Sequence, residues 1–314
     1  MASPPTPAWP GRSRRYPGRE RPGTVAAEVS AVAAPEAGQS LQPALSAADS
    51  PADSPAPNTE RLAGGVANRG RVFRIGQTVH RPQAPFPAAT HALLKHLDAG
   101  GVSGSPRLLA TDGDSEVLSG IPGQAARTPL PSWALGDAAL VSVALLLRRF
   151  HHAVGSFDPA GHNWPDERVP APYRWPTISH NDIHPGNIIF SDGRAIGLVD
   201  FDLAGPGSPI WDLAAAARCW CPLLSDEDVP NSVVDRRFER FALLLDAYGL
   251  AGHARVEVAE ALLDNQEWTF RIVVDNVMRG HLGFQHYWNS VAGRAERGHR
   301  WLTERRQDLI AAVR

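Results

Sequence analysis

Two short apolar segments flanking an Asp-Gly pair at residues 192–193 predict a β-hairpin. The segments are 188–190 and 195–199, and Asp-Gly is a favoured two-residue turn between antiparallel strands. Asn187 enters the first strand and Asp200 leaves the second, so strand pairing would bring both to the open end, roughly 5–8 Å apart. An amide oxygen and a carboxylate are hard oxygen ligands that suit Mg²⁺.

Asp182 lies five residues before Asn187, in the loop that leads to the same end of the hairpin. Phosphoryl transfer needs a metal that bridges phosphate oxygens and a carboxylate that orients the attacking hydroxyl and accepts its proton. Asp182 is therefore the candidate catalytic base, and Asn187 and Asp200 are the candidate metal ligands.

A zinc site is the alternative for this stretch. His180, Asp182 and His184 alternate as ligands do in some metallohydrolases, where imidazoles bind zinc. This alternative leaves Asn187 and Asp200 without a role.

The longer pattern resembles a known family. His180 to Asn187 reads H-x-D-x-x-x-x-N, Asp200 follows thirteen residues later in D-F-D, and W-D-L-A follows at 211–214. This pattern resembles the aminoglycoside phosphotransferase and choline kinase-like family over about residues 62–224. The resemblance implies an α+β, two-lobe protein-kinase-like fold, with a small β-rich N-lobe and a larger helical C-lobe. It also implies ATP (or GTP) with Mg²⁺ as cofactors.

The resemblance implies roles for single residues. Asp182 would be the catalytic base, and Asn187 and Asp200 would bind Mg²⁺. Asp202 would lie beside the metal site and help to bind metal or substrate.

Three further residues are implied around the catalytic loop. Asp212 resembles the buried aspartate that holds this loop through hydrogen bonds, and His180 would pack beneath it. His184 would either touch substrate or phosphate, or pack the loop.

The first part of the chain predicts mainly strands. Segments 72–75 and 78–80 read as one hairpin, and 106–110 and 116–118 as another, while 88–99 has the apolar spacing of a helix. A helix is expected at 135–154, followed by a Pro-rich connector at 158–176. After the hairpin, further helices are expected at about 211–219, 232–248, 254–276 and 290–312.

The predicted domains follow from this organisation. Residues 1–58 hold eleven of the 28 prolines and lack apolar periodicity, so they are expected to be a disordered tail. Residues 59–123 are expected to form the N-lobe with the hinge, and 124–314 the helical C-lobe with the acceptor site.

The N-lobe departs from the family pattern at its phosphate contacts. Relatives use a strand lysine paired with a helix glutamate. Lys95 is the only lysine and is expected to be exposed on a helix. Arg81 lies near the expected lysine position, and Arg74 is the other candidate for the phosphate contact. Arginine can also bind phosphate, through two donors. Residues 86–97 contain no acidic residue, and His91 occupies the approximate place of the glutamate.

Two glycine-containing segments complete the predicted nucleotide site. Gly64 and Gly65, with Gly70, form either a phosphate-covering turn or an ordinary hairpin turn. Segment 119–123, beginning at Ser119, resembles the hinge whose backbone hydrogen-bonds adenine.

Composition excludes several classes of partner. The net charge of −2 gives no reason to expect nucleic acid, and no run of 18 apolar residues predicts a membrane span. Cys219 and Cys221 are too close in sequence for a favourable disulfide and read as core residues, which fits a cytoplasmic protein.

The acceptor is expected to be a small molecule with a hydroxyl group, aminoglycoside-like or another small alcohol. A polycation would need several carboxylates; the candidates are Asp226, Glu227, Asp228, Asp235, Asp246, Asp264, Glu267 and Asp275. A choline-like acceptor would need an aromatic cage, for which tryptophans such as Trp268 and Trp288 are available. The alternative function is a catalytically silent pseudokinase that acts as a ligand-binding or immunity protein.

Overall fold

The computed structural model describes residues 59–62, 66, 68, 70–127, 130–165 and 169–314. The chain divides into two units, 1–54 and 55–314, and all the described residues belong to the second unit. The expected tail at 1–58 and the glycines Gly64 and Gly65 lie outside the described residues.

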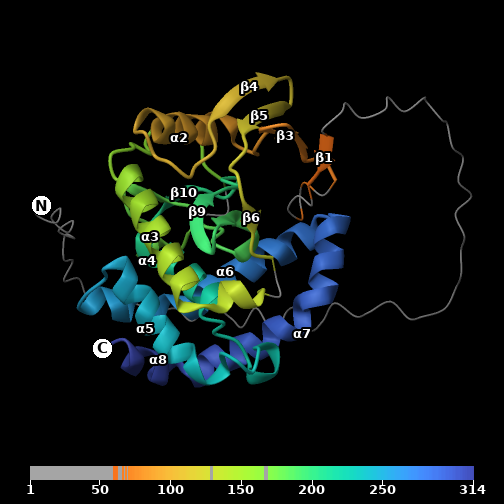
Figure 1. Cartoon of the computed structure of the whole chain (residues 1–314). Coiled ribbons are helices and arrows are strands. Elements are labelled where there is room, and N and C mark those ends of the chain that lie inside the picture. Colours follow the sequence, from red (N-terminus) through yellow and green to blue (C-terminus); the bar gives the residue numbers. More distant parts are fainter. Residues whose placement is uncertain (1–58, 63–65, 67, 69, 128–129, 166–168) are drawn as a thin grey trace, which may run out of the picture. The chain divides into compact units, whose positions relative to one another are not determined.

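The N-lobe is a five-stranded antiparallel sheet with α2 packed beside it (Figure 1). The strands follow the order β1-β2-β3-β5-β4; they are β1 (Thr59–Arg61), β2 (Phe73–Ile75), β3 (Thr78–Pro82), β4 (Leu108–Asp112) and β5 (Ser115–Ser119). Helix α2 (Pro87–Ala99) buries Leu93, Leu94 and Leu97, which recur at helical spacing. Both predicted hairpins and the predicted helix are confirmed.

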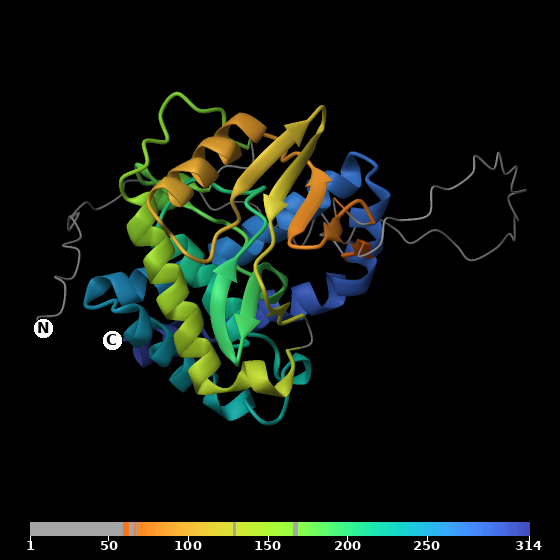
Figure 2. The same cartoon turned by 45° about the horizontal axis from the view of Figure 1, so that its top comes forward.

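The described residues also form two smaller sheets, one of which contains the hairpin drawn as green arrows in Figure 2. β8 (Ile188–Ser191) lies between β6 (Gln124–Ala125) and β9 (Arg194–Leu198), and β7 (Thr177–Ser179) pairs with β10 (Gly205–Gly207). The β8–β9 hairpin is the predicted one. The sequence analysis missed β6, β7 and β10, which have two or three residues each and no alternating apolar pattern.

The C-lobe is helical among the described residues. Its α-helices are α3 (Asp137–Val154), α4 (Pro209–Trp220), α5 (Arg237–Tyr248), α6 (His253–Met278), α7 (Leu282–Glu304) and α8 (Arg306–Ala312). Short 3₁₀ helices lie at Ser132–Leu135, Ala171–Tyr173, Pro185–Asn187, Asp226–Asp228 and Val234–Arg236.

The last predicted helix, 290–312, was wrong in its bounds. The structure has α7 from Leu282 to Glu304 and a separate α8, with a break at Arg305. The first turns of α7 contain glycine and several aromatic residues, which have low helix propensity and hid its start in the sequence.

Helix α3 packs against the β8–β9 hairpin and supports it. Leu140, Leu147 and Phe150 belong to the same hydrophobic cluster as Ile188 and Leu198 of the hairpin. The Ser142 hydroxyl of α3 also accepts a hydrogen bond from the Ala195 backbone at 2.8 Å. The hairpin is thus fixed on a buried helix, which suits a site that needs defined geometry.

In the part of the chain that the structure describes, no helix is both long and apolar enough to cross a bilayer.

Candidate active site

The β8–β9 hairpin brings Asn187 and Asp200 to the same end, as its sequence predicts. Ile188 pairs with Leu198, and the Val199 N–H donates to the Asn187 carbonyl at 2.9 Å. The turn residues 192–193 both have positive φ, +49° and +70°, as a type I′ turn requires. Asp200 directly follows Val199, so Asp200 lies at the same end of the hairpin as Asn187.

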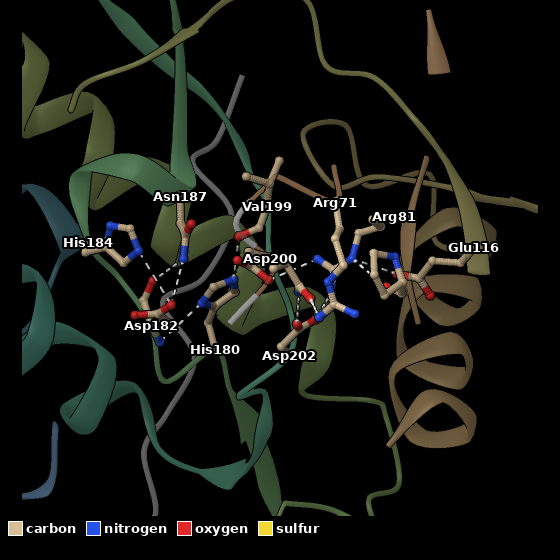
Figure 3. A network of polar contacts seen from close by, with 12 residues as sticks. Arg71, Arg81, Glu116, His180, Asp182, His184, Asn187, Val199, Asp200 and Asp202 are labelled. Carbon is tan, nitrogen blue, oxygen red and sulfur yellow. Dashed lines mark hydrogen bonds and ion pairs between the residues drawn. The ribbon is translucent and has the colours of Figure 1, made fainter. Parts of the chain in front are cut away.

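Asp182 and Asn187 are joined by hydrogen bonds. The Asn187 Nδ2 group donates to Asp182 Oδ2 at 2.9 Å and to the Asp182 carbonyl at 3.1 Å. This orientation leaves Asn187 Oδ1 without a hydrogen-bond donor among the described residues. Figure 3 shows the two side chains converging from the catalytic loop.

Asp212 of α4 anchors the candidate catalytic loop at residues 180–187. Its fully buried carboxylate accepts from the backbone N–H groups of His180 at 2.7 Å and Asn181 at 2.8 Å, and lies 2.9 Å from His151 Nε2. Asn181 has φ +68°, a backbone conformation that needs such support. These contacts agree with the role that the resemblance implied for Asp212.

His180 connects the loop to the end of β9. Its Nδ1 accepts from the Asp182 N–H at 3.3 Å, and its Nε2 lies 3.1 Å from the Val199 carbonyl, to which it can donate. The ring is fully buried, and this burial lowers its pKa below the ordinary value. A neutral ring is what these hydrogen bonds require, since one nitrogen accepts and the other donates.

His184 caps the short helix that carries Asn187. Its Nδ1 accepts from the Gly186 N–H at 3.0 Å, and its Nε2 lies 3.6 Å from Asp182 Oδ2. The side chain is 46% exposed. It therefore packs the loop and also stands beside the candidate base, so both predicted alternatives remain.

Arg81 of β3 reaches across to the carboxylates that follow the hairpin (Figure 3). Its Nη1 donates to Asp200 Oδ1 at 3.0 Å, and its Nη2 contacts Asp202 Oδ1. Burial alone would lower the pKa of Arg81, but Asp202, Asp200 and Glu116 outweigh it and raise the pKa. Burial, followed by the charge of Asp200, raises the pKa of Asp202 to about 7.

Glu116 is the site residue that the sequence analysis missed. It faces Arg81 across the β3–β5 pairing, and its Oε1 lies 3.2 Å from Arg81 Nε. Its Oε2 lies 2.7 Å from His91 Nε2 on α2. The acidic partner of the strand arginine thus comes from β5, and a helix histidine contacts that partner. The signal available in the sequence was an acidic residue within the predicted strand 116–118, next to Val117 and Leu118.

Arg74 and Ser119, the other described residues predicted to contact the nucleotide, differ in their hydrogen bonding. Arg74 faces Val79 in the β2–β3 pairing, which places it on the same sheet face as Arg81, and its buried Nε has no hydrogen-bond partner among the described residues. The Ser119 hydroxyl accepts from the Arg107 N–H at 2.8 Å, and its own N–H donates to the Arg107 carbonyl. These bonds use the Ser119 N–H and one acceptor position of its hydroxyl, and the hydroxyl hydrogen stays available as a donor.

Val66 and Asn68, between β1 and β2, lie close to residues of the C-lobe. Asn68 Nδ2 donates to Asp202 Oδ2 at 3.4 Å. A Cβ at Gly283 of α7 would lie 2.9 Å from the Val66 carbonyl, so the start of α7 approaches this segment closely. No sequence pattern indicated a role for Asn68.

The donor set fits magnesium better than zinc. Among the described residues, no three His, Cys, Asp or Glu side chains are grouped to hold a metal. His180 is buried and bonded to Val199, so the zinc alternative with Asp182 and His184 has no support. The free amide oxygen of Asn187 and the carboxylate of Asp200 are suitable for Mg²⁺, which often takes few protein ligands and completes its shell with phosphates and water.

The comparisons with known proteins agree with this geometry. The model of the phosphotransferase enzyme family (APH) matches residues 158–257. The chain is 32% identical over 214 residues to a trifolitoxin immunity protein from Rhizobium leguminosarum bv. trifolii, an alignment that covers 64% of this chain and 78% of that protein.

Solved structures share the fold at low sequence identity. A choline/ethanolamine kinase family protein from Mesorhizobium loti superposes with a TM-score of 0.57 at 19% identity, covering 82% of this chain and 93% of that one. An amicoumacin kinase in complex with AMP-PNP, Ca²⁺ and Ami superposes with a TM-score of 0.54 at 12% identity, covering 80% and 88%. The chain has a protein-kinase-like fold and belongs to the phosphotransferase enzyme family.

Proposed function

We propose that the protein transfers the γ-phosphoryl group of ATP (or GTP), with Mg²⁺, to a hydroxyl group of a small molecule. The observation that carries this proposal is the joint placement of Asp182, Asn187 and Asp200 at the open end of one hairpin. Family membership supports the reaction class, and the hydrogen bonds of these three residues support their individual roles.

Asp182 is the proposed general base. Its side chain is 33% exposed, so an acceptor hydroxyl can reach it, and the Asn187 amide fixes one of its oxygens. The carboxylate would orient the hydroxyl and take its proton as the new bond to phosphorus forms.

Asn187 and Asp200 are the proposed metal ligands. Bound there, Mg²⁺ would neutralise charge on the phosphate oxygens. Asn187 presents its amide oxygen because its amide nitrogen is held by Asp182. Asp200 has φ +67°, and its strained backbone aims the carboxylate from the end of β9.

Arg81 is the proposed phosphate contact, with Arg74 as a second donor on the same sheet face. Arg81 lies among three carboxylates, so one or more of these contacts would be exchanged for phosphate oxygens when nucleotide binds. The unpaired Nε of Arg74 is a buried donor available to an anionic ligand. We assign these contacts to an N-lobe at residues 59–123 and the acceptor site to a C-lobe at 124–314.

Asp182→Asn tests the proposal. Acceptor-dependent ADP release should fall by at least about a thousandfold, because the amide cannot accept the proton. Nucleotide binding should persist. Asp192→Asn is the matched control, since it makes the same change at the exposed far end of the hairpin, where asparagine tolerates the positive φ. Parental turnover in Asp182→Asn would exclude this residue as the base.

An immunity function without catalysis is the second candidate, favoured by the 32% identity to a trifolitoxin immunity protein. Cells that express the protein would then survive trifolitoxin equally well with Asp182→Asn. If the immunity depends on phosphoryl transfer, the same variant would abolish survival.

A further inference from the structure

Asp202, in the loop that follows β9, is bound by two side chains of the N-lobe. Its Oδ1 accepts from Nη2 of Arg81 on β3, and its Oδ2 accepts from Asn68 Nδ2 at 3.4 Å. The side chain is 21% exposed. Each oxygen of this carboxylate therefore already has a donor, and both donors come from the other lobe.

Asp200, two residues earlier, uses its carboxylate differently. Its Oδ1 accepts from Arg81 Nη1 at 3.0 Å, whereas its Oδ2 accepts no hydrogen bond among the described residues. Asp200 thus keeps an oxygen without a donor, as a metal ligand needs, and Asp202 does not. The two aspartates of the D-F-D segment are therefore suited to different tasks.

Arg81 has each of its three guanidinium nitrogens next to a different carboxylate (Figure 3). Its Nε lies 3.2 Å from Glu116 Oε1, and its Nη1 and Nη2 contact Asp200 and Asp202. The side chain is only 8% exposed. Because the guanidinium is planar and its donors have fixed directions, three such contacts determine both its position and its orientation.

Only one of these three contacts competes with the proposed metal site. Asp200 cannot give its full negative charge both to Arg81 and to a magnesium ion, so its contact with Nη1 weakens when the site is filled. The contacts of Nε with Glu116 and of Nη2 with Asp202 use other carboxylates and persist. Nη1 then becomes available to a phosphate oxygen while the guanidinium keeps its orientation.

Asp202 is needed for this orientation. Without it, Glu116 would still hold Arg81 at Nε, but no side chain would restrain the outer end of the guanidinium once Asp200 binds metal. A side chain that must be ordered when the ligand arrives binds more weakly than one that is already ordered.

We propose that Asp202 is a positioning residue for nucleotide binding: it holds Arg81 through Nη2, so that Nη1 is directed to the phosphates, and it does not itself bind the metal. This inference rests on the proposed function, in which Arg81 contacts phosphate. It assigns to Asp202 a role that acts through another side chain, in place of a direct contact with metal or substrate.

Calorimetric titration of Mg·ATP into single variants is the first part of the test. Asp202→Ala should raise Kd by at least about tenfold, because Arg81 loses a charged partner. Asp202→Asn should restore part of the loss, since an amide oxygen can still accept from Nη2. Asp246→Ala is the matched control: it removes an aspartate that pairs with Arg255 between α5 and α6, and it should bind like the parent protein.

The second part repeats the substitution in an Arg81→Gln background. If Asp202 acts through Arg81, Asp202→Ala should there change the affinity by less than about twofold. A metal ligand or a direct substrate contact would cost the same factor in both backgrounds. The rise in melting temperature at millimolar Mg·ATP measures binding in the weakest variants. Asp202→Asn, which keeps the shape of the side chain, replaces Asp202→Ala in this cycle if the alanine variant does not fold.

Two results would overturn the proposal. One is a parental affinity for Mg·ATP in Asp202→Ala, and the other is an equal loss of affinity with and without Arg81. Absence of Mg·ATP binding in the parent protein would instead count against the proposed function, which separates the two failures.

Discussion

Arg81 of β3 and Glu116 of β5 lie directly opposite each other in the N-lobe sheet, with Arg81 Nε 3.2 Å from Glu116 Oε1. Their side chains are only 8% and 2% exposed. In the family pattern the acidic partner of the strand cation comes from a helix. Here strand register sets the partner, and α2 contributes only the His91 contact to Glu116.

Removing one member of this buried pair should be costly. Arg81→Ala leaves Glu116 buried with His91 as its remaining partner, and the free energy of unfolding should fall by about 3–5 kcal/mol. The double variant Arg81→Ala/Glu116→Ala should lose less than the sum of the single losses, because Glu116 is then no longer left buried without its arginine. Urea denaturation of the parent, Arg81→Ala, Glu116→Ala and the double variant measures the coupling energy between the two residues. Additive losses would show that the pair does not act as a unit.

Removing the Asp212 carboxylate should destabilise the folded protein. Asp212→Ala leaves two buried backbone N–H groups and His151 without their acceptor, so stability should fall by about 3 kcal/mol. The corresponding decrease in melting temperature is about 6–12 °C for a domain of this size. Asp98→Ala, at the exposed end of α2, is a matched aspartate control with little expected change. A parental melting temperature for Asp212→Ala would contradict the anchoring role.

The buried ring of His180 predicts a dependence on pH. Its folded-state pKa is lowered from the ordinary 6.5, mainly by burial, so the unfolded chain binds a proton that the folded protein does not. The contribution of His180 to stability is therefore complete above pH 6.5 and is lost as pH falls toward the lowered pKa.

NMR titration of the histidine rings measures this directly. One ring, assigned by its absence in His180→Gln, should stay neutral from pH 8 to below 6, while the exposed ring of His253 provides a reference signal. A His180 ring that protonates near pH 6.5 or above would contradict the buried, neutral assignment.

The sequence predicted those parts of the fold that depend on local patterns. Asp-Gly at 192–193 and the apolar runs beside it specified the β8–β9 hairpin and therefore the position of Asn187 and Asp200. Strands β7 and β10 could not be predicted, since three residues such as Gly205–Gly207 carry no periodicity and pair across 26 residues of chain (from 179 to 205).

The parts of the site that sequence could not predict depend on tertiary placement. Glu116 becomes the partner of Arg81 only through the register between β3 and β5, which are separated by α2 and β4. The sequence left the acceptor open between a polycation and other small alcohols, and it could not show which of the candidate carboxylates, such as Asp226 and Asp228, pair with arginines.

Calorimetric titration of Mg·ATP tests the central claim most directly, because it needs no knowledge of the acceptor. The protein should bind ATP with Mg²⁺ and much more weakly with EDTA. Asp200→Asn, chosen because asparagine tolerates φ +67°, should weaken the magnesium-dependent binding by at least about tenfold, whereas Asp192→Asn should leave it unchanged. Absence of binding with Mg²⁺, or equal affinity in Asp200→Asn, would contradict the assignment of this hairpin end as a magnesium–nucleotide site.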